Sequence, residues 1–285
     1  MNVSKLLTRS GLVLSVGVWA SIAQAQSATP WTDGYNSKTR MVAGAVAKSG
    51  SMSARSVAGI EIVMADGWKT YWRNPGDAGG IPPNFDWSGS DNLASAKVLY
   101  PAPTRLSDAS GDSVGYKKSV VFPIEVTPKD LTKPVMLNVA MEFGVCREIC
   151  VPAEAKLSLS IPAQPRDPAS ATLTSAIDAV PRKAADRRPN DPEFKSGRAT
   201  LTGDKPMLEV DIAFADTGVG GDVFIEAPDG IYLALPKKVG AATGAIRTFV
   251  VDLATGVEPG ELKGKTVLIT MVSASGHSEA SWKIE

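Results

Sequence analysis

The sequence is poor in the residues on which most catalytic and metal sites depend. Its 285 residues include one histidine, His277, and two cysteines, Cys146 and Cys150. Zinc sites and hydrolytic triads draw on several histidine, cysteine or carboxylate groups, so we expect no metal site and no hydrolase. We expect His277, which lies between Gly276 and Ser278, in a short surface loop. Any chemistry is therefore expected to involve the two sulfur atoms.

An excess of charge of either sign is also lacking. Lysine and arginine total 30, aspartate and glutamate total 30, and the formal net charge is +0. Proteins that bind nucleic acid neutralise phosphates with basic side chains, so nucleic acid is not an expected partner. The hydrophobic content of 44% is sufficient for a folded core. At roughly 150 residues per domain, the length predicts two domains.

No apolar run in the sequence is long enough to cross a membrane. The longest, Gly11–Ile22, follows Lys5 and Arg9 and precedes Ala23-Gln24-Ala25. A charged start, a short apolar run and small residues are typical of a secretory signal peptide, and we predict residues 1–25 as that peptide, cleaved after Ala25. Export of this kind leads to an oxidising compartment, where two cysteines form a disulfide.

Most of the remaining sequence alternates between apolar and polar residues in short runs. Glycine, proline, asparagine and aspartate separate these runs, a pattern typical of antiparallel β-sandwiches. We predict an all-β protein with one sandwich over residues 31–162 and a smaller one over residues 196–285. A proline-rich linker, residues 163–195, is expected to join them and to include a short helix, Ala169–Val180. The clearest predicted strands are Val57–Met64, Val135–Phe143, Lys156–Ile161, Met207–Phe214, Val223–Ala227, Ile246–Leu253 and Thr266–Val272.

The spacing of the two cysteines restricts how they can pair. In an extended chain four residue steps span about 13 Å, whereas a disulfide needs Cα atoms roughly 4.4–6.8 Å apart. Cys146 and Cys150 can therefore pair only across a tight turn. Closing so short a loop stabilises a protein by only about 2 kcal/mol. A pair at the tip of a hairpin is open to attack by another thiolate, as exchange requires.

Two functions remain open from the cysteine spacing alone. The first is thiol exchange through Cys146 and Cys150. The second is a secreted β-sandwich adaptor or binding module in which the disulfide is a passive local clip. Removal of the disulfide distinguishes the two functions. It would abolish thiol exchange, which depends on the sulfur atoms, and would leave partner binding intact.

Several motifs resemble one known family. They begin with the aromatic and glycine-rich run Gly67–Gly80 and extend over most of residues 40–162. This part of the chain resembles the N-terminal periplasmic domain of the DsbD/ScsB family of thiol:disulfide interchange proteins, and the tail after Pro192 more weakly resembles the second immunoglobulin-like domain of ScsB-type proteins. The other matching motifs are Ile81–Trp87, Tyr100–Pro103, Gly115-Tyr116 and Gly144–Lys156.

The resemblance implies an immunoglobulin-like sandwich with protein-disulfide reductase activity in the periplasm. Cys146 and Cys150 would be the catalytic pair, which accepts electrons from a membrane-embedded reductase and passes them to oxidised periplasmic thioredoxin-like or isomerase proteins. Such exchange needs no cofactor. Because the transmembrane and thioredoxin-like parts of full-length members are missing here, we expect a stand-alone form whose electrons come from a separate DsbD/ScsB-type membrane protein.

The aromatic residues near the motifs have two possible roles. Trp68, Tyr71, Trp72 and Tyr116 are expected either to line a cap over the disulfide or to pack in the core. The segment Asn74–Asp77 is predicted as a simple turn. Of the two cysteines, we expect Cys150 to be the attacking thiol, because Pro152 and Ala153 leave it less crowded.

Overall fold

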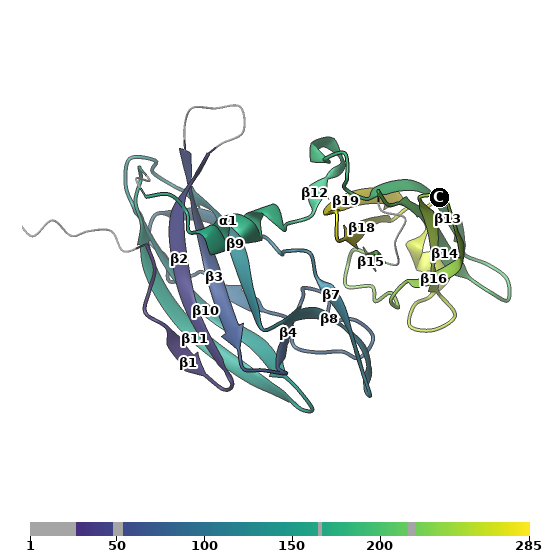
Figure 1. Ribbon diagram of the computed structural model, residues 1–285, viewed down its shortest axis with the longest axis horizontal. Coiled ribbons are helices and arrows are strands. Elements are labelled where there is room, and N and C mark those ends of the chain that lie inside the picture. The colour runs from purple at the N-terminus through teal and green to yellow at the C-terminus, as the bar shows by residue number, and fades with distance from the viewer. Residues whose placement is uncertain (1–26, 48–53, 165–166, 216–219) are drawn as a thin grey trace, which may run out of the picture.

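The computed structural model describes residues 27–47, 54–164, 167–215 and 220–285. The predicted signal peptide, residues 1–25, lies outside these residues. The described chain forms two immunoglobulin-like β-sandwich domains in tandem, which confirms the predicted fold class (Figure 1). Among these residues no helix is both long and apolar enough to cross a membrane.

The first domain consists of two packed antiparallel sheets. One sheet has the strand order β1-β2-β3-β9-β6, and the other β11-β10-β4-β8-β7 with β5 paired to β10. The strands of the first sheet are β1 (Thr32–Gly34), β2 (Ser37–Ala47), β3 (Ala54–Met64), β6 (Leu93–Val98) and β9 (Ser119–Pro128). Those of the second are β4 (Lys69–Tyr71), β5 (Asn84–Asp86), β7 (Thr104–Asp108), β8 (Gly111–Lys117), β10 (Val135–Cys146) and β11 (Cys150–Ile161).

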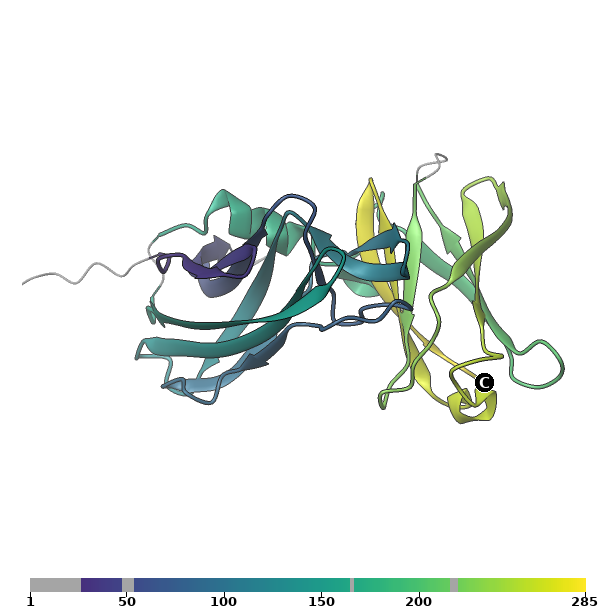
Figure 2. The same ribbon diagram turned by 90° about the horizontal axis from the view of Figure 1, so that it is seen from below.

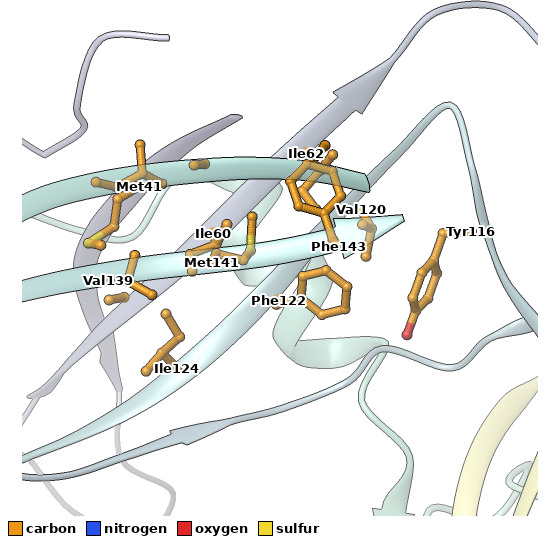
Figure 3. Close-up of a cluster of buried hydrophobic side chains, with 14 of the residues drawn as sticks. Met41, Ile60, Ile62, Tyr116, Val120, Phe122, Ile124, Val139, Met141 and Phe143 are labelled. Atoms are coloured by element: carbon orange, nitrogen blue, oxygen red, sulfur yellow. The ribbon is translucent and has the colours of Figure 1, made fainter. Parts of the chain in front are cut away.

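The core of this domain follows from the alternation in the sequence. Successive side chains of a strand point to opposite faces, so every second residue of β10 is buried. Val139, Met141 and Phe143 are almost fully buried and pack in one cluster with Ile60 and Phe122 of the facing sheet (Figure 3). Burial of each such side chain contributes roughly 1.5–3 kcal/mol. The core thereby holds β10, and with it the start of the cysteine hairpin, in place.

The second domain is a smaller sandwich of two four-stranded sheets. Its sheets have the orders β12-β19-β18-β15 and β13-β14-β17-β16. The strands of the first are β12 (Arg182–Lys183), β15 (Asp222–Glu226), β18 (Thr266–Ser273) and β19 (Gly276–Lys283). Those of the second are β13 (Glu193–Thr200), β14 (Met207–Ala213), β16 (Lys237–Thr243) and β17 (Ile246–Asp252), and two short 3₁₀ turns, η1 (Ala184–Asp186) and η2 (Pro259–Leu262), complete the domain.

One expectation for this domain is wrong. His277 does not lie in a loop, because the β18–β19 turn is so tight that His277 already pairs with Val272 inside β19. Its side chain is half-buried, and this burial lowers its pKa from the ordinary value.

The segment between the sandwiches packs on both of them. Helix α1 (Ala171–Asp178) lies within the predicted range, and the Ser170 side chain caps its start by accepting a hydrogen bond from the Leu173 amide at 3.2 Å. Leu173 is fully buried against Val42 and Val121 on the outer face of the first sheet. Further on, β12 joins the second domain by pairing with β19. The predicted linker is therefore largely ordered.

Arginine side chains of the first domain bind carboxylates of the second. Arg73 donates to both oxygens of Glu226, the shortest contact being 2.7 Å, and to Glu279 at 2.8 Å. Arg105 makes a similar paired contact with Asp222, at 2.8 and 2.9 Å. The sandwiches are thus in direct contact through charged groups. Figure 2 shows the two domains side by side from below.

Candidate functional site

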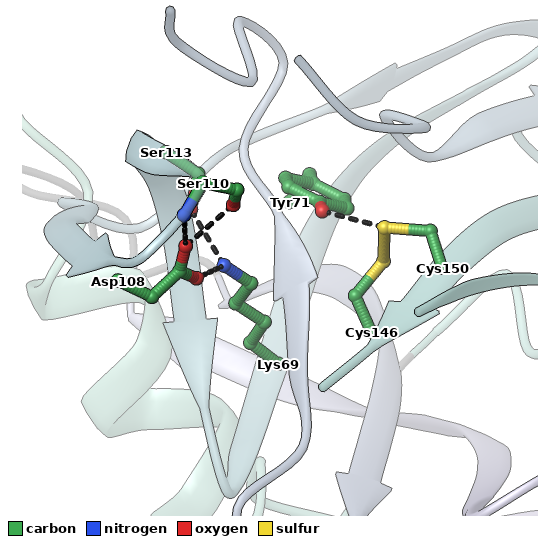
Figure 4. Close-up of a disulfide and its surroundings, with 7 residues drawn as sticks. All are labelled: Lys69, Tyr71, Asp108, Ser110, Ser113, Cys146 and Cys150. Atoms are coloured by element: carbon green, nitrogen blue, oxygen red, sulfur yellow. Dashed lines mark hydrogen bonds and ion pairs between the residues drawn. A yellow bond between two sulfur atoms is a disulfide. The ribbon is translucent and has the colours of Figure 1, made fainter. Parts of the chain in front are cut away.

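The two cysteines face each other at the end of one hairpin. Strands β10 and β11 pair along their whole length, and the last pair in the register is Cys146 with Cys150. The loop between them holds three residues and is closed by the Arg147 amide, which donates to the Ile149 carbonyl at 3.1 Å. The Cα atoms of the cysteines lie 4.1 Å apart and the sulfur atoms form a disulfide (Figure 4). The predicted tight turn is confirmed.

The two sulfur-bearing residues differ in exposure. Cys146 is 1% exposed, because β10 is an inner strand and Cys146 pairs with Lys69 of β4 on its other side. Cys150 begins β11 at the edge of the sheet and is exposed. Exchange requires a direct approach of the attacking thiolate to one sulfur. The geometry therefore presents Cys150, and not Cys146, to an incoming thiol.

The Tyr71 side chain contacts the disulfide. Its hydroxyl lies 2.9 Å from the Cys150 sulfur (Figure 4). Since a disulfide sulfur carries no proton, the tyrosine hydroxyl is the donor. Burial, and to a lesser degree the negative charge of Asp108, raises the pKa of Tyr71 above its usual value. Tyr71 therefore keeps its proton at neutral pH, and a hydrogen bond of this kind stabilises a thiolate on Cys150.

The ring of Tyr71 is held between two glycines. A Cβ on Gly80 would lie 2.4 Å from the ring, and one on Gly144 would lie 3.2 Å from it. Gly80 also has a φ of +151°, which side chains rarely allow. Next to it, the Ile81 carbonyl accepts a hydrogen bond from the Gly144 amide at 2.9 Å. Gly80 and Ile81 thus lie beside β10 and against the tyrosine.

An ion pair between a buried lysine and an exposed aspartate fixes the strand that carries Tyr71. Lys69 is 8% exposed, and its ammonium donates to Asp108 at 2.6 Å and to Ser113 at 2.9 Å. The hydrogen bond from Lys69, together with those from Ser110, holds the pKa of Asp108 well below its usual range. A buried ammonium is tolerated only when it is paired in this way. These contacts tie β4 to β7 and β8 (Figure 4).

The other three aromatic residues considered from the sequence lie elsewhere. Trp72 is fully buried and its ring lies 5.6 Å from that of Phe224 in the second domain. Tyr116 is buried beside Phe122 and donates its hydroxyl proton to the Pro101 carbonyl at 2.8 Å. Trp68 packs edge-on against the ring of Tyr35, 5.3 Å away. Trp72 and Tyr116 belong to the core, which is one of the two roles considered for them from the sequence.

Sequence reasoning missed Lys69, Asp108 and the contact of Gly80 with Tyr71. A lysine inside an aromatic run was the only local signal for the ion pair, because Asp108 lies 39 residues away. Sequence reasoning also treated Asn74–Asp77 as a simple turn, whereas this segment reaches the second domain.

Fold and site together define a β-sandwich protein with an accessible hairpin disulfide. Residues 40–162 match the family model described as the N-terminal part of the thiol:disulfide interchange protein DsbD. The chain is similar to the crystal structure of the N-terminal periplasmic domain of ScsB from Proteus mirabilis, with a TM-score of 0.65 and 19% identity over 90% of this chain and 98% of that one. A comparison with curated protein sequences found no match.

This chain therefore carries, in residues 40–162, an N-terminal domain of the DsbD/ScsB family. The domain over residues 40–162 is thus of a kind found in thiol:disulfide interchange proteins. The family assignment predicted from the sequence motifs is confirmed.

Proposed function

We propose that this protein is a periplasmic thiol:disulfide exchange protein in which Cys146 and Cys150 cycle between disulfide and dithiol. The observation that supports this most strongly is the placement of Cys150, which is exposed at a sheet edge and accepts a hydrogen bond from Tyr71. A disulfide that only clips a loop needs neither an exposed sulfur nor a neighbouring proton donor. Exchange needs the first and is assisted by the second.

The exchange proceeds through a mixed disulfide. A thiolate of the electron donor attacks the Cys150 sulfur, the Cys146–Cys150 bond breaks, and Cys146 leaves as a thiolate that takes up a proton. The donor's second thiolate then attacks the donor's first sulfur, which is bonded to Cys150 in the mixed disulfide. Cys150 leaves as a thiolate and takes up a proton. Two electrons have then moved to this protein, and the donor is left with a disulfide.

The same sequence in reverse delivers the electrons. The Cys150 thiolate attacks the disulfide of an oxidised acceptor, and Cys146 resolves the mixed disulfide by attacking Cys150. Tyr71 assists the step in each direction in which Cys150 is a thiolate: the release of Cys150 from the mixed disulfide with the donor, and the attack of Cys150 on the acceptor. Its hydroxyl stabilises the charged form of that sulfur.

Partners and location follow from the family and from the first residues of the sequence. A membrane-embedded DsbD/ScsB-type reductase is the proposed electron donor, and oxidised periplasmic thioredoxin-like or isomerase proteins are the proposed acceptors. Residues 1–25 are the proposed signal peptide, which would direct the chain to the periplasm. The relative from Proteus mirabilis is itself described as a periplasmic domain.

The reduction potential of the cysteine pair tests the proposed function. We expect a value of about −180 to −270 mV, the range of catalytic dithiols, when the protein without residues 1–25 is equilibrated in graded glutathione buffers and its free thiols are counted. A value below about −300 mV is typical of structural disulfides and would favour a passive clip in a binding module.

The assignment of Cys150 as the attacking thiol predicts different reactivity for the two single variants. Reduced Cys146→Ser, which keeps Cys150, should form a mixed disulfide with oxidised glutathione about tenfold faster than Cys150→Ser, which keeps the buried thiol. The mass of the intact protein measures the product at timed intervals. Equal rates, or a faster reaction of Cys150→Ser, would contradict the assignment.

A further inference from the structure

Cys146 has to carry a negative charge in a place with little access to water. In the proposed exchange it leaves as a thiolate when the disulfide is reduced, and it attacks as a thiolate when it resolves the mixed disulfide with the acceptor. Cys146 is 1% exposed, and burial disfavours the charged form of a thiol. Tyr71 contacts the sulfur of Cys150. A positive charge near Cys146 would therefore assist both steps.

The neighbour of Cys146 on β4 is a buried lysine. The register of β10 and β4 pairs Cys146 with Lys69, and residues directly opposite on antiparallel strands project from the same face, with Cβ atoms about 4.5–5.5 Å apart. On its other side Cys146 pairs with Cys150. Lys69, Cys146 and Cys150 thus lie in one row across three neighbouring strands, and Figure 4 shows them together with Tyr71.

The two charges of the Lys69 ion pair differ in exposure. The Lys69 side chain is 10% exposed, and that of Asp108 is 39% exposed. The Lys69 ammonium also donates to Ser113, which is fully buried. Water and salt screen an exposed charge more strongly than a buried one. At a buried neighbour such as Cys146, the positive end of the pair therefore acts more strongly than the negative end.

The other charged side chains close to Cys146 in the described part of the chain are exposed. Arg147 and Glu148 follow it in the hairpin loop and carry opposite charges. On β8, Lys117 pairs with Lys69 and so lies one strand further from Cys146. All three of these side chains are exposed, so their charges are screened. The buried charge beside Cys146 is that of Lys69.

We propose that the buried charge of Lys69 stabilises the thiolate of Cys146. Lys69 makes Cys146 a better leaving group in the reduction of the disulfide, because a more stable thiolate leaves faster. It also increases the charged fraction of Cys146 when Cys146 resolves the mixed disulfide. Strand β4 then supplies one group for each sulfur, Tyr71 for Cys150 and Lys69 for Cys146. This inference rests on the proposed function, because both steps belong to exchange.

The pKa of Cys146 tests the inference directly. In reduced Cys150→Ser, Cys146 is the one remaining cysteine, and the Cβ chemical shift of isotopically labelled cysteine reports its ionisation as the pH is raised. Adding Lys69→Met, which keeps the length of the side chain and removes its charge, should raise the pKa of Cys146 by about one unit. With both cysteines present, Lys69→Met should make reduction by dithiothreitol about threefold slower at the same pH.

Lys117→Met is the matched control. It removes the same charge at an exposed position one strand further away, and it should leave both the pKa of Cys146 and the rate of reduction close to those of the unsubstituted protein. An equal shift in Lys117→Met would mean that the net charge of this face acts on the sulfur, and would overturn the role of Lys69.

Asp108→Asn separates the charge of Lys69 from the structural role of the ion pair. It breaks the same ion pair as Lys69→Met but keeps the ammonium, so the pKa of Cys146 should fall. A rise in both variants would mean that the ion pair acts by holding β4 in place, and would overturn the inference. Both variants should fold, because without the ammonium the Ser113 hydroxyl still donates to the Leu106 carbonyl at 3.2 Å. If Lys69→Met does not fold, Asp108→Asn decides, and a pKa of Cys146 that does not fall overturns the inference.

An unchanged pKa of Cys146 in folded Lys69→Met would also overturn the inference. Failure of the proposed function is distinguishable from this result. It would appear as a potential in the structural range in the unsubstituted protein, whereas the pKa of Cys146 is measured on reduced protein without a partner.

Discussion

Replacing Cys146 and Cys150 together with serine should abolish thiol exchange and leave the protein folded. The disulfide closes a loop with a sequence separation of only 4 residues, so the loss of unfolding free energy should be about 2 kcal/mol in the chain-entropy model. The hairpin itself remains paired over the rest of β10 and β11 and is held by the core. Urea unfolding measures the stability, and reduction of glutathione disulfide by the pre-reduced protein measures exchange.

The loop offers a control for this pair of substitutions. Glu148→Gln changes an exposed residue of the same loop, keeps both sulfur atoms and should leave both measurements close to those of the unsubstituted protein. Exchange that persists in the double serine variant would contradict the proposed function. Loss of the folded state would show that the disulfide has a structural role larger than its short loop predicts.

Replacing Arg73 with alanine should destabilise the protein by roughly 3 kcal/mol, the lower end for removing one partner of a buried ion pair. The Arg73 side chain is 26% exposed, and those of Glu226 and Glu279 are each 19% exposed. Burial disfavours its charge, yet the hydrogen bonds with Glu226 and Glu279 outweigh that effect and raise the pKa of Arg73. Without the guanidinium, two partly buried carboxylates face each other with no cation between them.

The geometry of this contact supplies its control. Arg73→Lys keeps the positive charge but loses the paired geometry with Glu226, so it should retain part of the stability lost in Arg73→Ala. Urea unfolding of both variants measures the difference. A loss below about 1 kcal/mol in Arg73→Ala, the value of an exposed ion pair, would show that the contact between the domains contributes little.

The aromatic run shows where sequence reasoning reached its limit. Neighbouring residues of a strand point to opposite faces, so Tyr71 and Trp72 could not both reach the disulfide. The strand β4 has only three residues, Lys69–Tyr71, too few for alternation to show which face is the core. The partners that decide the matter, Phe224 for Trp72 and Cys150 for Tyr71, are distant in the sequence.

No local sequence pattern predicts the contacts between the domains. Arg73 lies 153 residues from Glu226 and 206 from Glu279, and Asp77 lies 155 residues from Tyr232. The turn residues Asn74–Asp77 have the composition of any turn, and nothing local distinguishes a turn that binds another domain from one that faces water.

The amino-acid sequence by itself determined the all-β class and the tight turn between the cysteines. Both follow from local sequence. A strand of a sandwich alternates apolar and polar residues, and a disulfide across four residue steps requires a tight turn to bring the two Cα atoms together. Only the tertiary structure decided which cysteine is exposed, which tyrosine contacts it and which groups join the two domains. Those features depend on sheet order, register and domain packing, and these bring together groups that no local pattern connects.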